Sequence, residues 1–383
     1  MRGMRTTWDI FCEVIDNFGD IGIAWRLARS LAREHGYTVR LWVDEPGAFH
    51  HIWPAADPDA DEQVCEGVVV RVWREPFEAD DPADVVIDAF GCTLPTVYLE
   101  AMAARAAPPV WINLEYLSAE PWVAEHHGLP SPHPRLPLVR HFFFPGYTAD
   151  TGGLLVERDL EAQRASFLAE SLPQFWRDLG VDAPTPDELR VSLFAYENPA
   201  LGGLLDAWAA GERRVTCLVP EGRILPQLSG WFGLPLQAGA KATRGVLTVH
   251  VLPFLDQDHY DHLLWACDLN FVRGEDSCVR AQWAQRPFVW QAYPQADAVH
   301  WEKVDALLAH YVQGLDAETM HAVTVFWRLW NGVPTAEPVA SCWARWEAGE
   351  AVLAKHAAHW RERIAGAGRL TEKLVEFVES PIK

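Results

Sequence analysis

Residues 16–22, Asp-Asn-Phe-Gly-Asp-Ile-Gly, join a predicted strand (Thr7–Ile15) to a predicted helix (Ile21–His35) through a glycine-containing turn. In α/β proteins, ligands bind at the loops that leave the carboxyl ends of the strands. Asp16 and Asp20 flank this turn, and two carboxylates there suit general-base chemistry or a cationic substrate better than a phosphate. The spacing also fits a structural interpretation, in which Asp16 starts the turn and Asp20 caps the helix.

The first half of the chain alternates between strand-forming and helix-forming segments. A helix is predicted at Pro95–Ala106, whereas the acidic run Asp57–Glu62 and the proline-rich run His126–Pro137 are predicted to be loops. Continuous apolar strands that alternate with helices indicate an α/β fold with a parallel sheet covered on both faces. Runs of β-branched and aromatic residues predict these further strands: Thr38–Asp44, Gly67–Trp73, Asp84–Phe90 and Pro109–Leu117.

Turn-forming residues concentrate at Gly180–Asp187, and a second alternating series follows them. We therefore predict two doubly wound domains, residues 1–182 and residues 188–362. The end of the chain, residues 363–383, is predicted to form an amphipathic helix that packs back on the first domain. The predicted elements of the second series are strands at Arg190–Tyr196, Arg214–Pro220, Leu247–Phe254, Asp268–Val272 and Pro287–Tyr293, and helices at Leu201–Gly211, His259–Cys267 and Val279–Gln285.

The composition is that of a globular protein with ample core. At 383 residues, 49% hydrophobic and 22% charged, the chain is long enough for two or three domains. Its net charge of −21 disfavours nucleic-acid binding, which requires clustered lysine and arginine. No apolar run approaches the ~20 residues of a membrane span, and no signal peptide is evident. Seven scattered cysteines without a Cys-x-x-Cys motif indicate reduced thiols, so we predict a cytoplasmic protein with no membrane or nucleic-acid partner.

A second candidate site begins in residues 268–277, Asp-Leu-Asn-Phe-Val-Arg-Gly-Glu-Asp-Ser, which run from a predicted buried strand into a helix. Arg273 and Gly274 fall at the turn, where helix amides and a guanidinium favour a phosphate or diphosphate. The neighbouring acids Glu275 and Asp276 are costly beside an anion. Either they cap the helix, or one of them faces a sugar hydroxyl or a cation.

Aromatic and amide side chains follow other strands at the same edge. Phe254, Gln257 and Tyr260 come after the strand that ends at residue 254, and such residues can stack on a base and read it. Tyr196 and Asn198 close the first strand of the second series and meet the same edge. The alternative for the 252–261 segment is an ordinary strand end followed by helix-capping aspartates.

Other ligand motifs are weak. His259 and His262 lie three residues apart, as metal ligands can, but no third ligand has suitable spacing and helix-surface histidines fit better. The Gly-x-x-x-x-Gly-Lys-Ser/Thr phosphate loop is absent. The loop glycines Gly19 and Gly22 provide only part of the Gly-x-Gly-x-x-Gly pattern, so a nicotinamide or flavin cofactor is poorly supported.

Four motifs together resemble a known family. They are residues 16–22 with the following Trp25-Arg26-Leu27-Ala28-Arg29, then residues 113–118 (Asn-Leu-Glu-Tyr-Leu-Ser), residues 271–277 and residues 293–295 (Tyr-Pro-Gln). The likeness is to the bacterial protein-arginine rhamnosyltransferases of elongation factor P, the EarP family, and it runs over essentially the whole chain. It implies a GT-B glycosyltransferase architecture, with two Rossmann-like domains that face each other across a cleft.

The resemblance also implies a reaction. The family transfers L-rhamnose from dTDP-β-L-rhamnose to one arginine of elongation factor P with inversion, and the modified factor helps ribosomes through proline runs. No metal and no cofactor are expected. Two other enzymes remain as alternatives, a GT-B glycosyltransferase for a small molecule or glycan and a nicotinamide-dependent oxidoreductase. A third alternative is a nucleotide-sugar-binding module without catalysis.

By the same resemblance, Asp16 is the expected general base, Asp20 orients the acceptor guanidinium or shares that role, and Glu275 places the sugar or the arginine. A guanidinium needs such carboxylates, because its pKa above about 12 makes it a poor nucleophile. The donor is expected to contact residues near the diphosphate and sugar (Arg273, Gly274, Asp276 and Ser277), residues around the thymidine and phosphates (Phe194, Tyr196, Phe254, Gln257, Tyr260 and Tyr293) and Asn113 of the first domain.

Overall fold

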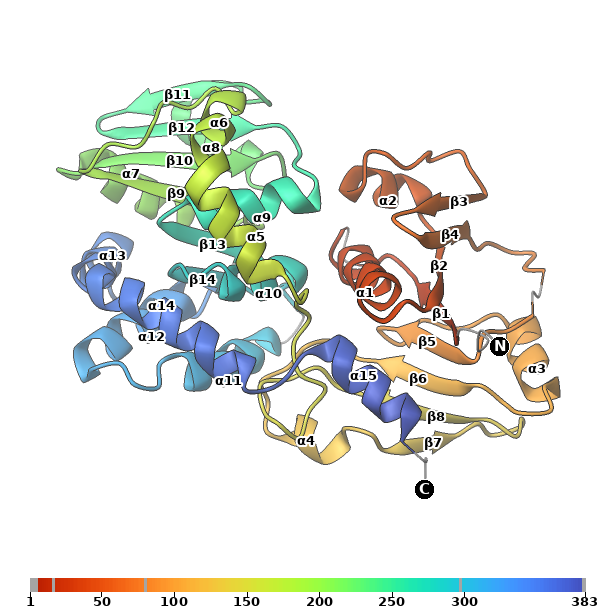
Figure 1. The fold of residues 1–383 in the computed structure, drawn as a ribbon. Coiled ribbons are helices and arrows are strands. Elements are labelled where there is room, and N and C mark those ends of the chain that lie inside the picture. Colours follow the sequence, from red (N-terminus) through yellow and green to blue (C-terminus); the bar gives the residue numbers. More distant parts are fainter. Residues whose placement is uncertain (1–5, 16–17, 79–80, 296–297, 381–383) are drawn as a thin grey trace. The chain divides into compact units, whose positions relative to one another are not determined.

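The computed structural model describes residues 6–15, 18–78, 81–295 and 298–380. The chain divides into two compact units, Met1–Arg158 with Ile364–Lys383, and Asp159–Arg363. Each unit contains one sheet in which most strands are parallel (Figure 1), as the alternating sequence pattern predicts. The α/β class is therefore confirmed.

The first unit has an eight-stranded sheet in the order β3-β4-β2-β1-β5-β6-β8-β7. The edge strands β3 and β7 are antiparallel to their neighbours and the other strands are parallel. Strand β7 lies inside residues 126–137, so the prediction of an irregular loop there is wrong in part. The strands are β1 (Thr7–Cys12), β2 (Thr38–Val43), β3 (Glu62–Cys65), β4 (Val68–Val72), β5 (Val85–Ala89), β6 (Val110–Leu114), β7 (Pro130–Pro132) and β8 (Val139–Phe143).

Helices cover this sheet because successive strand residues point to opposite faces. On one face, Phe11 of β1 packs with Trp42, Tyr98 and Met102 in a buried cluster under α3. On the other, α1 packs against β1 and β2 and ends at Gly36, whose φ of 70° suits a glycine C-cap. The helices of the unit are α1 (Gly19–His35), α2 (Pro46–Ile52), α3 (Thr96–Ala104), α4 (Trp122–His126) and α15 (Leu370–Glu379).

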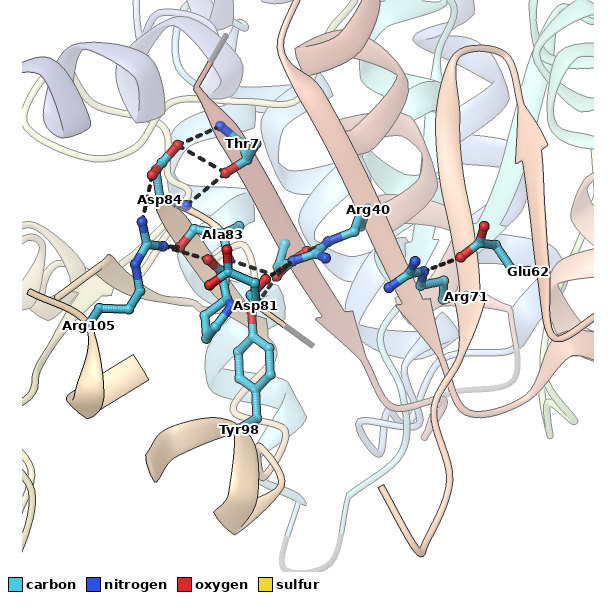
Figure 2. A network of polar contacts seen from close by, with 11 residues as sticks. Thr7, Arg40, Glu62, Arg71, Asp81, Ala83, Asp84, Tyr98 and Arg105 are labelled. Carbon is cyan, nitrogen blue, oxygen red and sulfur yellow. Dashed lines mark hydrogen bonds and ion pairs between the residues drawn. The ribbon is translucent and has the colours of Figure 1, made fainter. Parts of the chain in front are cut away.

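A polar network ties the strands β1, β2 and β5 together in their amino-terminal halves (Figure 2). The fully buried carboxylate of Asp9 accepts two hydrogen bonds from Arg40, at 2.5 and 2.6 Å, and others from the Tyr98 hydroxyl and the Ala83 amide. Asp84 accepts hydrogen bonds from the Thr7 amide and hydroxyl. It also accepts one from the guanidinium of Arg105, at the C-terminal end of α3. The network lies away from the carboxyl ends of the strands, so its role is structural.

Arg40→Met is expected to lower the free energy of unfolding by about 3–5 kcal/mol, because it leaves the buried Asp9 carboxylate without its cation. Arg71→Met is the matched control: both guanidinium groups lie over the Trp42 ring, at 5.8 and 5.3 Å, but Arg71 pairs with the exposed Glu62. That exposed pair is worth less than about 1 kcal/mol. Urea unfolding curves measure both, and equal losses would contradict the structural role given to Asp9.

The second unit has a six-stranded sheet in the order β11-β12-β10-β9-β13-β14, with only the edge strand β11 antiparallel to its neighbour. Its strands are β9 (Glu188–Leu193), β10 (Arg214–Pro220), β11 (Lys241–Arg244), β12 (Leu247–Leu252), β13 (Leu269–Arg273) and β14 (Phe288–Gln291). Its helices are α5 (Leu160–Ser166), the π-helical turn η1 (Phe167–Ser171), α6 (Leu172–Asp178), α7 (Leu201–Ala210), α8 (Leu225–Phe232), α9 (Gln257–Ala266), α10 (Asp276–Trp283), α11 (His300–Tyr311), α12 (Ala317–Trp330), α13 (Val339–Ala348) and α14 (Glu350–Ala365).

The boundary between the units differs from the predicted one. The chain enters the second unit at Asp159, and the expected linker at residues 180–187 lies within that unit. The reason is that this segment packs on the second unit: Phe167 of η1 stacks on His262 of α9 with ring centroids 4.3 Å apart, Phe175 of α6 meets the same ring edge to face, and Arg164 of α5 donates to the Ala284 carbonyl at 3.1 Å. The last residues, Ile364–Lys383, group with the first unit, where the sequence analysis places the C-terminal helix. There, Lys373 donates to the Thr151 carbonyl at 2.6 Å.

Two further observations concern the whole described chain. All seven cysteines lie at described positions, and each is a buried free thiol, as their scattered spacing predicts. Among the described residues, every helix is too short or too polar to cross a lipid bilayer.

Candidate functional site

In the first unit, candidate residues gather where β1, β5 and β6 end. Asp16, the predicted general base, lies outside the described residues. Asp20 lies in the first turn of α1 and is 1% exposed. Its Oδ2 accepts a hydrogen bond from the Ile15 amide (2.9 Å) and its Oδ1 accepts one from the Tyr116 hydroxyl (3.0 Å). Phe18, not Asp20, occupies the N-cap position, so the capping interpretation of Asp20 is wrong.

Asn113, at the carboxyl end of β6, belongs to this first-unit cluster. With the side-chain amide oriented to match its neighbours, its nitrogen donates to Glu115 Oε1 (2.8 Å) and its oxygen accepts from the Gly91 amide (3.1 Å). The two predicted loop glycines also lie here: Gly19 is the first residue of α1, and the Gly22 amide donates to the Phe18 carbonyl at 3.0 Å. Sequence reasoning assigned no role to Tyr116, although this residue belongs to the 113–118 motif.

Asp88 on β5 is a third buried carboxylate of this unit, after Asp9 and Asp20, and the sequence analysis did not single it out. It accepts hydrogen bonds from Trp111 Nε1 (2.7 Å) and from Arg140 (3.3 Å), and its side chain is fully buried. Burial raises the pKa of Asp88 to about 7, although Arg140 and Trp111 favour its charged form. A single aspartate in an apolar strand offers no sequence signal that separates such a group from a surface residue.

The raised pKa of Asp88 makes stability depend on pH. Between about pH 4 and pH 7 the folded protein keeps a proton that the unfolded chain releases, so rising pH favours unfolding. Relative to an Asp88→Asn variant, the wild type is therefore expected to lose about 2–3 kcal/mol of unfolding free energy between about pH 5 and pH 8. Urea unfolding of both proteins across this range measures the difference. A constant difference would show that Asp88 is ionised throughout.

In the second unit, the site residues gather at the carboxyl ends of β9, β12, β13 and β14. Arg273 ends β13 and is 7% exposed. Its guanidinium lies 4.3 Å from the Phe194 ring centroid and 4.4 Å from that of Tyr196, so two aromatic rings hold it. Gly274 follows with φ of 63°, and its amide donates to the Gln291 carbonyl (3.2 Å). This left-handed residue turns the chain from β13 into α10.

Two acids and a serine follow this turn. Glu275 occupies the N-cap position of α10 but makes no side-chain capping hydrogen bond. Asp276, in the first helical turn, accepts from Gln257 Nε2 at 3.3 Å, so α9 and α10 are linked there. The Ser277 hydroxyl accepts from the Arg273 amide at 3.1 Å and donates to the Arg273 carbonyl, so it closes the β13–α10 turn. The sequence left two explanations for Glu275: it caps the helix, or it faces a sugar hydroxyl or a cation. Because its side chain makes no capping hydrogen bond, the structure does not support the first explanation.

The remaining predicted donor residues lie at different depths in the second unit. Tyr260 packs its ring against the edge of Phe194, and burial raises the pKa of its hydroxyl far above the usual value. Tyr293 is 47% exposed and contacts Tyr196 edge to face, with centroids 5.4 Å apart. Phe254 is half-buried just after β12. The structure thus brings Tyr260 to Phe194 and Tyr293 to Tyr196, the two rings that lie over Arg273.

Gln291, at the end of β14, is a site residue that sequence reasoning missed. Its side chain accepts from the Tyr196 amide (2.9 Å) and donates to the Glu197 carbonyl (3.3 Å), while its own carbonyl accepts from Gly274. It therefore joins the loop that carries Tyr196 to the turn that carries Arg273. The only sequence signal for Gln291 was that a polar residue ends an otherwise apolar strand.

The histidines considered as metal ligands have structural partners. His259 Nδ1 contacts Asp256, which also caps α9 by accepting from the His259 amide, and the His262 ring stacks on Phe167. Within the described ranges, no three histidine, cysteine, aspartate or glutamate side chains are placed to hold a metal ion. The chemistry available at this edge is thus a held guanidinium, helix amides and aromatic faces, which suit a nucleoside diphosphate.

Two Rossmann-like units with ligand residues at the carboxyl ends of their strands define the GT-B class of glycosyltransferases. A solved structure of MurG from Acinetobacter baumannii shares this fold, with a TM-score of 0.52 over 98% of this chain and 99% of that chain. Its sequence is 12% identical, so the likeness shows the fold alone.

A family model and relatives with higher sequence identity show the family to which this chain belongs. The family model described as "Elongation-Factor P (EF-P) rhamnosyltransferase EarP" matches residues 8–379, and the chain belongs to this family. The protein-arginine rhamnosyltransferase of Pseudomonas putida is 50% identical over 99% of this chain and 100% of its own length. The protein-arginine rhamnosyltransferase of Pseudomonas aeruginosa is 46% identical over 97% of this chain and 98% of its own length. The structure solved as "Structural basis for EarP-mediated arginine glycosylation of translation elongation factor EF-P" is 39% identical, with a TM-score of 0.69 over 97% of this chain and 98% of that chain.

Proposed function

We propose that this protein transfers L-rhamnose from dTDP-β-L-rhamnose to one arginine of elongation factor P, with inversion at the anomeric carbon. The modified factor then relieves ribosomes that stall at proline runs. Family membership supports the rhamnosyl group and the protein acceptor. The nucleotide, the stereochemistry and the role in translation go beyond that membership and are the proposal itself.

The observation that carries the donor assignment is the guanidinium of Arg273 between Phe194 and Tyr196 at the amino end of α10. A guanidinium makes bidentate contacts to phosphate oxygens, and the helix amides add positive potential at the same place. We assign the diphosphate to Arg273 and these amides, and the thymine to the neighbouring aromatic rings. Charge that develops on the departing diphosphate is then neutralised by protein groups.

The acceptor side requires carboxylates. Asp16 takes a proton from the arginine, Asp20 aligns the guanidinium, and Glu275 places the sugar or the arginine. The freed nitrogen lone pair attacks the anomeric carbon, the bond from that carbon to the diphosphate oxygen breaks, and dTDP leaves. Attack from the opposite side converts the β-linked donor into an α-linked rhamnosyl-arginine. A general base typically contributes about 10²- to 10⁴-fold to such a rate.

Intact-mass spectrometry of elongation factor P tests the function. The factor is incubated with this protein and dTDP-β-L-rhamnose in the presence of a chelator, and separately with dTDP-glucose as the control donor. A gain of one deoxyhexose on a single arginine, only with the rhamnosyl donor, is the expected result. Donor consumption with unmodified factor would instead favour a GT-B enzyme for a small molecule or glycan.

A further inference from the structure

Two aromatic residues without an assigned role, Phe90 and Tyr116, stack on each other, and Tyr116 contacts Asp20. Phe90, directly after β5, has φ of 58°, a left-handed conformation that residues with a bulky side chain rarely adopt. Its amide donates to the Leu114 carbonyl at 2.6 Å, and its ring stacks on Tyr116 with centroids 4.5 Å apart and planes 18° apart. Backbone strain of this kind persists where surrounding contacts hold it, and it concentrates at functional sites.

Tyr116 connects this pair to the carboxylate. Its hydroxyl donates to Asp20 Oδ1 at 3.0 Å, while the other oxygen, Oδ2, accepts from the Ile15 amide at 2.9 Å. One oxygen is thus held by the loop after β1 and the other by the segment after β6. Two donors from different elements fix both the position and the rotation of the carboxylate, which one donor alone does not achieve.

We propose that Tyr116, held in place by its stack on Phe90, is a positioning residue that fixes the carboxylate of Asp20 for the acceptor arginine. The inference rests on the proposed function, in which Asp20 aligns a guanidinium. A guanidinium and a carboxylate pair through a planar fork, so rotation of the carboxylate breaks the alignment. The hydroxyl acts through Asp20 and needs no contact with either substrate.

Tyr116→Phe is the sharpest test, because it keeps the ring and its stack and removes only the hydroxyl. We expect kcat for transfer to elongation factor P to fall about 10-fold or more, since catalytic geometry that is loose by about 1 Å can cost up to about 10²-fold. The KM for the donor and the melting temperature should stay near their wild-type values. Tyr37→Phe is the matched control: it removes a hydroxyl of the same unit that donates to the exposed Glu379 at 3.4 Å, and it should leave kcat unchanged.

A second variant tests the stack. Phe90→Gly suits the left-handed backbone and removes the ring that supports Tyr116. We expect it to lower kcat, and we expect Phe90→Gly with Tyr116→Phe to lose no more than the worse single variant, because both act through one carboxylate. An unchanged kcat in Tyr116→Phe, or losses that multiply in the double variant, would overturn the proposal.

Different experimental results would refute the proposed function and this inference. Wild-type protein that does not modify elongation factor P refutes the function and leaves the geometry testable. Crystal structures of the wild type and Tyr116→Phe then decide: rotation or displacement of the Asp20 carboxylate in the variant supports the positioning role. An unmoved carboxylate in the variant overturns it. If Tyr116→Phe does not fold, the same comparison is made with Phe90→Gly.

Discussion

Asp20→Asn is expected to lower the rate of rhamnosyl transfer to elongation factor P by about two orders of magnitude or more, while dTDP affinity stays near the wild-type value. Asparagine has nearly the same shape and still offers an oxygen to the Ile15 amide or the Tyr116 hydroxyl, the two donors that hold Asp20. Asparagine lacks the negative charge that, in the proposed mechanism, aligns the acceptor guanidinium. The variant therefore changes the chemistry with little change in packing.

Single-turnover kinetics of arginine modification measure this effect, and titration with dTDP measures the affinity. Asp44→Asn is the matched control, because the Asp44 carboxylate also accepts a hydrogen bond from the loop after β1, from the Val14 amide at 3.1 Å. It should retain wild-type turnover within about threefold. Asp16→Asn, at the predicted general base, is expected to lose transfer to a similar extent as Asp20→Asn. Full activity of either Asp16→Asn or Asp20→Asn would remove that residue from the mechanism.

Arg273→Lys is expected to weaken dTDP binding about 30- to 100-fold, although the charge is kept. Lysine presents a point charge and cannot make the planar bidentate contact to phosphate, and it stacks poorly between two rings. The Arg273 guanidinium lies 4.3 and 4.4 Å from the rings of Phe194 and Tyr196, so the substitution loses both features together. The proposed site binds the free nucleotide, so we expect the loss to appear in the affinity for dTDP, before any chemistry.

Isothermal titration with dTDP measures the Arg273 effect without the acceptor protein. Arg244→Lys is the control, because that guanidinium also stacks on aromatic rings of the second unit, 3.9 Å from Trp231, but on its exposed surface. It should leave the affinity unchanged. Comparable affinities for Arg273→Lys and the wild type would mean that the diphosphate binds elsewhere.

Much of each cluster was predictable because parallel strands end at a common sheet edge. Arg273 follows one predicted strand and Tyr196 ends another, and β9 and β13 are neighbours in the sheet. Asp20 is likewise marked by its place in the glycine-containing turn after β1. Such residues are recognisable by chemistry that is unusual at a strand end: a charge or an aromatic ring beside glycine.

Other features could not be predicted from a single sequence. Tyr116 and Gln291 look ordinary in sequence, and their partners, Asp20 and the Tyr196 amide, lie about 95 residues away along the chain. The unit boundary at Arg158 was also not predicted, because the helices that follow it join the second unit through tertiary contacts: η1 and α6 contact α9, and α5 contacts the segment after α10.

The sequence by itself determined the alternation of strands and helices, the α/β class, the two candidate edges and, by resemblance, the family. These depend on local hydrophobic period, on turn chemistry and on long motifs, all of which are written along the chain. Only the tertiary structure decided that Tyr116 and Ile15 hold the Asp20 carboxylate and that Phe194 and Tyr196 enclose Arg273. The direction in which a side chain points, and what it meets there, depends on the packing of elements that are distant in sequence.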